Sequence, residues 1–229
     1  MTPPPLVLAS TSRYRRSLVE RLGVPFAAMA PDFDERAHDD AFERLGPHAF
    51  ALQLARGKAA SVARALVAAA GTSVGASATP ADDADVCPRA DGGRWILAAD
   101  QLALLPAGAD APARLLHKPG TPVAAVEQLM TLAGREHRLV TAIVLRGHDG
   151  TEHHGVDEVV LHMRAFGRAE AEAYVDACAP LDCAGSYRVE DRGITLFRAI
   201  DGADPTSIMG LPLLLTASLL RRAGLLPGP

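Results

Sequence analysis

Hydroxyl and guanidinium side chains are concentrated in one short stretch near the start of the chain, Ser10-Thr11-Ser12-Arg13-Tyr14-Arg15-Arg16. Cations in the first turn of a helix are repelled by the positive end of the helix dipole, and a bound anion would offset that repulsion. Free backbone N–H groups at a helix N-terminus and nearby arginines together bind phosphate. The stretch therefore predicts a phosphate site. The alternative is that the arginines point into water or pair with surface carboxylates.

Two carboxylate positions complement this cationic stretch. Glu35 ends the acidic cluster Asp32-Phe33-Asp34-Glu35, which is either a solvated loop or the place where a divalent cation is held beside phosphates. Asp100 follows the apolar segment Trp95-Ile96-Leu97-Ala98-Ala99, so we expect it at the end of a buried strand. Strand ends are where α/β folds place their chemistry, although a carboxylate that caps a turn is the commoner arrangement.

Two lysines could add positive charge to such a site. Lys58 lies in a run of helix-forming residues and directly follows Gly57, which costs a helix roughly 1 kcal/mol relative to alanine. A close packing contact or a close ligand would explain that glycine. Lys118 follows a short apolar segment. A single lysine is usually solvated, so neither residue by itself indicates a phosphate site.

The elements that must position these residues follow from apolar periodicity and from capping residues. Ser12 is the expected N-cap of the first helix, after a buried strand over residues 6–9. Thr121, followed by Pro122, is expected to begin a second clear helix. Residues 71–93 have no period of either kind and are expected to form a long mobile surface loop. The remaining expected elements are helices over 42–69 and 169–177, strands over 94–101, 102–105, 139–145 and 156–163, and a last helix after Gly210-Leu211-Pro212.

Composition excludes several classes of protein. The chain of 229 residues corresponds to one large domain or two small lobes, and we favour one domain. A net charge of -4 and an isoelectric point near 6.0 argue against a general nucleic-acid or membrane surface. The 3 cysteines lack metal-site or disulfide-framework spacing, which favours a reducing, cytoplasmic setting. The apolar stretch over 211–220 is far below the ~20 residues that span a bilayer.

The order of the motifs resembles that of the Maf family of nucleoside triphosphate pyrophosphatases. The resemblance covers nearly the whole chain and fails only across residues 71–93, which look like an insertion. It is closest to the branch of the family that hydrolyses 7-methyl-GTP. The motifs that carry it are Ser10 to Arg16, Glu35, Ala55-Arg56-Gly57-Lys58-Ala59, Ala99-Asp100-Gln101, Lys118-Pro119, Cys183-Ala184-Gly185-Ser186-Tyr187 and Gly210-Leu211-Pro212-Leu213.

The resemblance implies an α/β fold of the Maf/ITPase-like type. Its elongated mixed β-sheet is flanked by helices, and two lobes enclose a central cleft within a single domain over 1–229. It also implies a hydrolase that acts on a phosphoric anhydride bond. Cleavage falls between the α and β phosphorus atoms with a divalent cation, Mg²⁺ or Mn²⁺, and releases a monophosphate and pyrophosphate. The partners implied are a small nucleotide substrate and a second copy of the chain in a homodimer, with no nucleic acid and no membrane.

Site roles carry over from the family to the matching positions. Asp100 resembles the proton acceptor that activates water. Glu35 would orient either the metal or a lysine, and the metal would contact Asp100. The residues that would hold the triphosphate and offset the charge of the leaving pyrophosphate are Ser10, Arg15, Arg16, Lys58 and Lys118.

In the family, the residues at the positions of Tyr14, Gln101 and Glu190 select the base. A 7-methylguanine ring carries positive charge, which favours stacking on Tyr14 and hydrogen bonds to the Glu190 carboxylate. The sequence departs from the family at three positions. Arg13 stands where the family often has a proline, and His117 stands where a glycine is usual. Tyr14 replaces a tryptophan that is typical of the 7-methyl-GTP branch. Two other functions remain open, namely a dTTP/UTP pyrophosphatase of the same family and a non-catalytic nucleotide-binding regulator of cell division.

Overall fold

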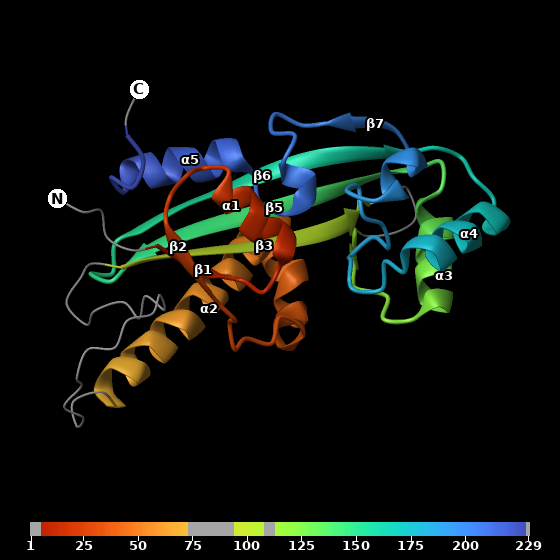
Figure 1. The fold of residues 1–229 in the computed structure, drawn as a ribbon. Coiled ribbons are helices and arrows are strands. Elements are labelled where there is room, and N and C mark those ends of the chain that lie inside the picture. The colour runs from red at the N-terminus through yellow and green to blue at the C-terminus, as the bar shows by residue number, and fades with distance from the viewer. Residues whose placement is uncertain (1–5, 73–93, 108–112, 228–229) are drawn as a thin grey trace. The chain divides into compact units, whose positions relative to one another are not determined.

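The computed structural model describes residues 6–72, 94–107 and 113–227 (Figure 1). The chain forms two compact units. The described part is mixed α/β, with 7 strands that pair in both parallel and antiparallel fashion. Unit one comprises Met1–Asp100, Ala142–Val156 and Leu213–Pro229, and unit two comprises Gln101–Thr141 and Asp157–Pro212. Strands β3 (Trp95–Leu105), β5 (Glu136–Gly147) and β6 (Glu152–Met163) contribute residues to both units.

Strand β1 (Leu6–Ala9) lies at the centre of the parallel part of unit one. It pairs in parallel with β2 (Phe26–Met29) and with the first residues of β3. All of its residues are buried, as expected for a parallel strand that is covered on both faces. Helix α1 (Arg13–Glu20) connects β1 to β2, so the apolar run predicted as a strand delivers the hydroxyl-rich turn directly at its end.

Two longer helices lie on opposite sides of the unit-one strands in Figure 1, α2 (Phe42–Thr72) and α5 (Leu213–Arg222). A short 3₁₀-helix, η1 (Arg36–Ala41), precedes α2. Gly155 allows α5 to pack closely on β6, because a Cβ atom at this glycine would lie 2.7 Å from the Leu215 side chain. The strands of unit one are therefore covered by helices from both ends of the chain.

Helix α2 confirms the helix predicted over residues 42–69, with one interruption. Gly46 has φ 72° and ψ 170°, and Pro47 follows it, so the continuous helix begins at this proline. The helix continues to Thr72, and the first two residues of the loop predicted over 71–93 are helical. Residues 73–93 lie outside the described residues, and the predicted loop there stays a prediction.

Strand β3 corrects two expectations. The sequence predicts one strand over residues 94–101 and another over 102–105, but the structure has a single strand from Trp95 to Leu105. The segment from Trp95 to Leu105 contains neither glycine nor proline, so nothing ends the strand at Gln101. Asp100 therefore lies in the middle of a buried strand and not at its end, which is possible because a lysine pairs with its carboxylate inside the fold.

Unit two is built around antiparallel pairing. The second half of β3 pairs with β4 (Arg114–Leu116), and β6 pairs with β7 (Phe197–Asp201). Helices α3 (Pro122–Leu132) and α4 (Arg168–Cys178) pack on one another and contribute to one apolar core with these strands. Thr121 caps α3 as predicted, since its side chain accepts a hydrogen bond from the N–H of Ala124.

The hairpin predicted from residues 139–145 and 156–163 is confirmed, with longer strands than expected. Strand β5 extends to Gly147 and β6 begins at Glu152, and the Gly147 N–H donates to the Thr151 carbonyl at 2.8 Å to close the turn. Among the described residues, no helix is both long enough and apolar enough to cross a lipid bilayer.

Candidate active site

The turn between β1 and α1 forms as the sequence predicts. Ser12 is the N-cap of α1, and its Oγ accepts a hydrogen bond from the N–H of Arg15 at 3.3 Å. The N–H of Ser12 donates to the Oγ of Ser10 at 3.1 Å, and Ser10 is buried. The Ser10 hydroxyl is therefore held beside the N-terminus of a helix, where an anion is favoured.

The two arginines predicted to bind phosphate have different surroundings. Nη1 of Arg15 donates to the carbonyl oxygen of Ala99 at 2.9 Å, which brings this guanidinium next to Asp100 on β3. Burial lowers the pKa of Arg15, and the negative charges of Asp100 and Glu35 act in the opposite direction. The Arg16 side chain is exposed. The repulsion expected at the start of α1 is therefore offset, for Arg15, by acceptors from β3.

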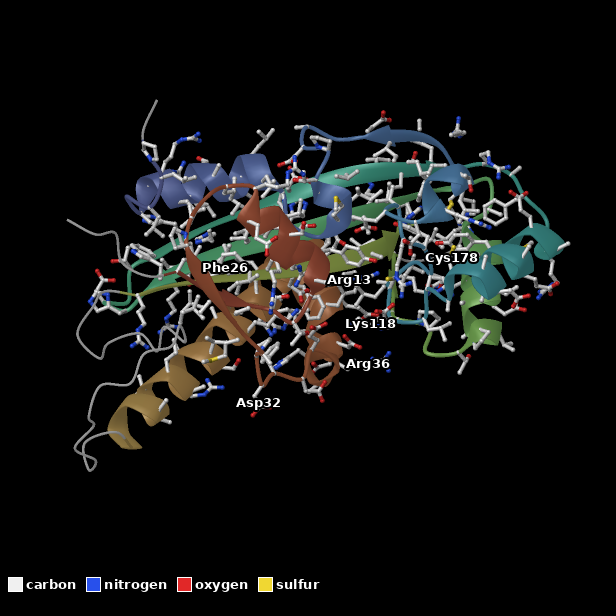
Figure 2. The ribbon with its side chains drawn as sticks, in the orientation of Figure 1. Arg13, Phe26, Asp32, Arg36, Lys118 and Cys178 are labelled. Carbon is white, nitrogen blue, oxygen red and sulfur yellow. The ribbon has the colours of Figure 1, made fainter. Side chains whose placement is uncertain are left out.

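The guanidinium group of Arg13 lies over the ring of Tyr14. The Arg13 guanidinium carbon lies 4.7 Å from the centre of the Tyr14 ring, and Nη2 of Arg13 donates to the Tyr14 hydroxyl at 2.6 Å. Figure 2 labels Arg13 on α1. This cation–π contact covers one face of the ring. A base stacked on Tyr14 would use the opposite face.

Asp100, Lys58 and Glu35 form a charged cluster in unit one. Nζ of Lys58 lies 2.6 Å from Oε1 of Glu35 and also contacts Oδ1 of Asp100. Lys58 is 6% exposed and Asp100 is 2% exposed. The sequence left open whether Glu35 orients a metal or a lysine, and in the structure it pairs with Lys58.

Burial makes Asp100 a stronger proton acceptor than an exposed aspartate. Desolvation raises the pKa of Asp100 and Glu35 raises it further, against the opposite effects of Lys58 and Arg15. A base accepts a proton more effectively as its pKa approaches the working pH. The Lys58 ammonium has three N–H donors, and its two carboxylate contacts leave one for another oxygen.

A packing contact explains the glycine beside Lys58. A Cβ atom at Gly57 would lie 2.2 Å from the ring of Phe33, so only glycine lets this ring pack directly on α2. Phe33 also stacks on His38, with ring centres 5.0 Å apart. The contact holds the acidic segment against α2 and brings Glu35 to Lys58. Sequence reasoning missed Phe33, although its place inside the acidic cluster was the available indication.

The acidic cluster is only partly solvated. Glu35 is part of the charged cluster, whereas Asp32 and Asp34 are exposed. Figure 2 labels Asp32 together with the exposed Arg36. An Asp34 carboxylate oxygen accepts a hydrogen bond from the Arg36 N–H at 3.0 Å, as in an ordinary turn.

In unit two, Gln101 is held by two hydrogen bonds. Its Nε2 donates to Oγ1 of Thr141 at 2.8 Å and to the carbonyl oxygen of Ser207 at 2.7 Å. Gln101 is partly exposed, and both partners are buried. Sequence reasoning found Gln101 but not these partners, because Ser207 is 106 residues away along the chain.

Lys118 is exposed and lies in a segment that is tied to the loop formed by the Cys183-Ala184-Gly185-Ser186-Tyr187 motif. Nε2 of Gln128 donates to the carbonyl oxygen of His117 at 3.1 Å. The hydroxyl of Ser186 donates to Oε1 of the same glutamine at 2.6 Å. Gln128 thus connects the backbone beside Lys118 to the loop, a bridging role that no sequence pattern indicated.

Glu190 is exposed, in a loop that Arg188 anchors. The Arg188 guanidinium donates to the carbonyl oxygen of Cys178 at 3.0 Å and pairs with Asp182. The Gly193 N–H donates to the Arg188 carbonyl at 3.0 Å, and a Cβ atom at Gly193 would lie 2.2 Å from that oxygen. The backbone on both sides of Glu190 is therefore fixed.

The side chains present would complete a divalent-cation site only with further ligands from a bound substrate. Within the part of the chain that the structure describes, no group of three or more His, Cys, Asp or Glu side chains is arranged to hold a metal ion. Glu35 and Asp100 lie close enough to share the Lys58 ammonium. Mg²⁺ is commonly bound by one or two carboxylates and completed by substrate phosphates and water. These two carboxylates fit that kind of site.

The predicted site residues fall into two sets, one in each unit. The structure brings Arg15, Glu35, Lys58 and Asp100 together, with Ser10 in the turn that leads to α1. Tyr14 and Arg16 lie on α1 itself. Gln101, Lys118 and Glu190 belong to unit two.

Fold and site together define a mixed α/β protein with a buried aspartate–lysine pair and an arginine-bearing helix N-terminus. The Maf-like protein family matches residues 5–223. The chain belongs to this family. It is 39% identical over 221 residues to the 7-methyl-GTP pyrophosphatase of Xanthomonas oryzae pv. oryzae, which covers 96% of this chain and 97% of that protein.

Two further relatives have the same name. The 7-methyl-GTP pyrophosphatase of Burkholderia lata is 38% identical over 224 residues, with 96% of this chain and 90% of that protein covered. The 7-methyl-GTP pyrophosphatase of Bdellovibrio bacteriovorus is 35% identical over 221 residues, with 96% of this chain and 97% of that protein covered. The similarity therefore extends over nearly the full length of each chain.

Proposed function

We propose that this protein is a nucleoside triphosphate pyrophosphatase that hydrolyses 7-methyl-GTP to 7-methyl-GMP and pyrophosphate. The observation that carries the proposal is the buried Asp100 carboxylate, with its raised pKa and its Lys58 partner. The names of the relatives support the choice of substrate. The reaction would remove a non-canonical nucleotide.

In the proposed reaction, Asp100 accepts a proton from a water molecule as the water oxygen attacks the α-phosphorus. The bond between the α-phosphorus and the bridging oxygen breaks, and pyrophosphate leaves with that oxygen. Positive charge that is already fixed in place stabilises the negative charge developing on the leaving group. Arg15 and Lys58 supply it near Asp100. Ser10, Arg16 and Lys118 are proposed as the remaining phosphate ligands.

Asp100 and Glu35 would hold a divalent cation, Mg²⁺ or Mn²⁺, that neutralises phosphate charge when it is bound. Tyr14, Gln101 and Glu190 are proposed to select the base. A tyrosine face and a carboxylate both favour the positively charged 7-methylguanine ring over unmodified guanine. We also propose a single Maf-like domain with an insertion over 71–93, a cytoplasmic setting and a homodimer.

A substrate comparison tests the proposal. The purified protein is incubated with Mg²⁺ or Mn²⁺ and separately with 7-methyl-GTP, GTP, dTTP, UTP and CTP, and monophosphate and pyrophosphate are measured. We expect 7-methyl-GTP to have the highest kcat/KM and Asp100→Asn to abolish the preference by abolishing turnover. Preference for dTTP or UTP would reject the roles of Tyr14, Gln101 and Glu190 and keep the enzyme class. Binding without turnover would favour the non-catalytic regulator.

A further inference from the structure

The segment that contains Lys118 is tied to the rest of unit two on both sides of the lysine. On one side, the carbonyl oxygen of His117 accepts a hydrogen bond from Nε2 of Gln128 at 3.1 Å. On the other side, the N–H of Gly120 donates to the carbonyl oxygen of Leu181 at 3.0 Å. The backbone of Lys118 therefore lies between two fixed points, while the residue itself is exposed.

The orientation of the Gln128 amide follows from its partners. A backbone carbonyl only accepts hydrogen bonds, so the NH₂ group of the amide must face His117. The amide oxygen then faces the hydroxyl of Ser186 at 2.6 Å, and that hydroxyl must donate. Gln128 lies on α3, so one residue of a helix offers a donor to the lysine segment and an acceptor to the loop of Ser186.

Ser186 has a backbone conformation that favours glycine. Its φ is 61°, in the left-handed region that side chains other than glycine rarely adopt. The residue is fully buried, and its N–H donates to the carbonyl oxygen of Cys183 at 3.1 Å. A glycine would remove the strain but would have no hydroxyl for Gln128. The hydrogen bond therefore offsets the strain of a serine at this position.

The residue after Ser186 fixes the loop to the core of unit two. Tyr187 is 5% exposed, and its hydroxyl lies 2.8 Å from Nε2 of His137 on β5. Its ring lies against Gly185, where a Cβ atom would be 2.6 Å from a ring carbon. Ser186 is thus a fixed point, and Gln128 connects the lysine segment to it.

From these contacts we infer that Gln128 and Ser186 are positioning residues for Lys118, and that they hold its backbone where the ammonium group meets the phosphates of the nucleotide. The inference deepens the proposed function and rests on it, because it takes Lys118 as a phosphate ligand. A lysine ammonium sits on a flexible stem and loses conformational freedom when it binds. A backbone that is fixed beforehand reduces this loss and so strengthens binding.

Calorimetric binding of 7-methyl-GTP to the Asp100→Asn protein with Mg²⁺ tests the inference without turnover. Gln128→Met keeps the length of the side chain and removes both hydrogen bonds, and it should raise Kd about 5-fold. In a protein that also carries Lys118→Met, the same change should raise Kd less than about 2-fold, because the positioned group is gone. A purely structural role for Gln128 would raise Kd by the same factor in both proteins.

Two changes of Ser186 separate positioning from stability. Ser186→Gly removes the hydroxyl and relieves the left-handed backbone, so its Tm should stay close to that of the parent protein. Ser186→Ala removes the hydroxyl and keeps the strain, so its Tm should be lower. Kd for 7-methyl-GTP should rise about 5-fold in both variants. A Kd that rises in Ser186→Ala and not in Ser186→Gly would show that stability alone is affected, and would overturn the inference.

Glu127→Met is the matched control, because Glu127 is the neighbouring residue on α3 and pairs with Arg168 at the surface. Its Kd should equal that of the parent protein. Equal factors with and without Lys118→Met overturn the inference, as does a Lys118→Met protein that binds as tightly as its parent. Hydrolysis of 7-methyl-GTP by the unmodified protein would still support the proposed function in both cases. The expected Kd values without any hydrolysis overturn the proposed function alone.

Discussion

The two sets of site residues differ in kind. In unit one, Asp100, Lys58, Glu35 and Arg15 are charged and close together, and the aspartate and lysine are almost fully buried. In unit two, Gln101 is held by neutral groups only, a hydroxyl and a carbonyl. The charged cluster suits the binding of phosphates, and the two hydrogen bonds fix the direction of the Gln101 amide, as the proposed selection of a base requires.

The difference has an energetic consequence. Removing one member of a buried charge pair leaves the other charge without a partner, which costs several kcal/mol. Removing one member of a neutral hydrogen bond costs about 1 kcal/mol. Substitutions in the cluster of Asp100, Lys58 and Glu35 should therefore abolish chemistry or shift its pH dependence, and substitution of Gln101 should change substrate preference.

The largest effect is expected for Asp100→Asn. Loss of a general base should lower kcat by roughly 10²–10⁴-fold, while the nucleotide still binds. Steady-state kinetics and calorimetry measure the two quantities. Asp32→Asn, a change of an exposed aspartate, is the control and should leave kcat unaltered. A kcat that falls equally in both variants would contradict the role of Asp100.

A change to Lys58 tests whether the cluster acts as one unit. Lys58→Met removes a positive charge and should reduce kcat/KM by roughly 10²–10³-fold. In the proposed reaction, activity requires ionised Asp100 and should fall as the pH drops through the pKa of Asp100, which burial raises above that of an exposed aspartate. Since Lys58 lowers this pKa, its loss should move the acid limb of the kcat/KM profile to higher pH.

Arg56→Met is the matched control for Lys58→Met, because Arg56 is also on α2 but pairs with Glu152 at the surface. The pH profile of this control should coincide with that of the unmodified protein. An acid limb that stays in place or moves to lower pH in Lys58→Met would reject the coupling of Lys58 to Asp100.

In unit two the pH dependence should appear in stability. His137 is fully buried, its Nε2 lies 2.8 Å from the Tyr187 hydroxyl, and its Nδ1 has no hydrogen-bond partner. Burial lowers the pKa of His137 to about 4, with a smaller contribution from His162. The neutral form is favoured in the fold, so this stabilisation is complete above about pH 6.5 and is lost as the pH falls towards 4.

The loss that His137 causes between pH 7.5 and 4.5 should be about 3 kcal/mol in the free energy of unfolding. Urea unfolding at the two pH values measures it. His137→Gln should show a smaller decrease than the unmodified protein, whereas the exposed His148→Gln should not. Equal decreases in all three proteins would contradict the prediction.

The smallest effect concerns Tyr14. Arg13→Ala removes the guanidinium that lies on one face of the Tyr14 ring and repels a cationic base stacked on the opposite face. An exposed cation–π contact is worth about 0.5–1 kcal/mol, so KM for 7-methyl-GTP should fall by roughly 2–5-fold. KM for GTP should change less, because its base is uncharged. A larger change for GTP would contradict a stacking role for Tyr14.

Much of the local structure could be predicted from the sequence because it depends on neighbouring residues. The Ser12 cap, the Thr121–Pro122 helix start and the β5–β6 hairpin all follow from short-range patterns, and all three are confirmed. The predicted extent of β3 was wrong because the charged residue Asp100 was expected at the end of a buried strand. Nothing local announces that Asp100 has a buried lysine partner 42 residues away.

Most of the elements, their caps and the residue types available for chemistry could be predicted from the sequence, since apolar period and capping are local properties. Tertiary packing was needed to show that Glu35 pairs with Lys58, that Gly57 accommodates Phe33, and that Ser207 orients Gln101. Each of these contacts joins segments that are remote in the chain. Such contacts depend on how whole elements pack, because close packing and the need to satisfy every buried polar group select one arrangement of partners.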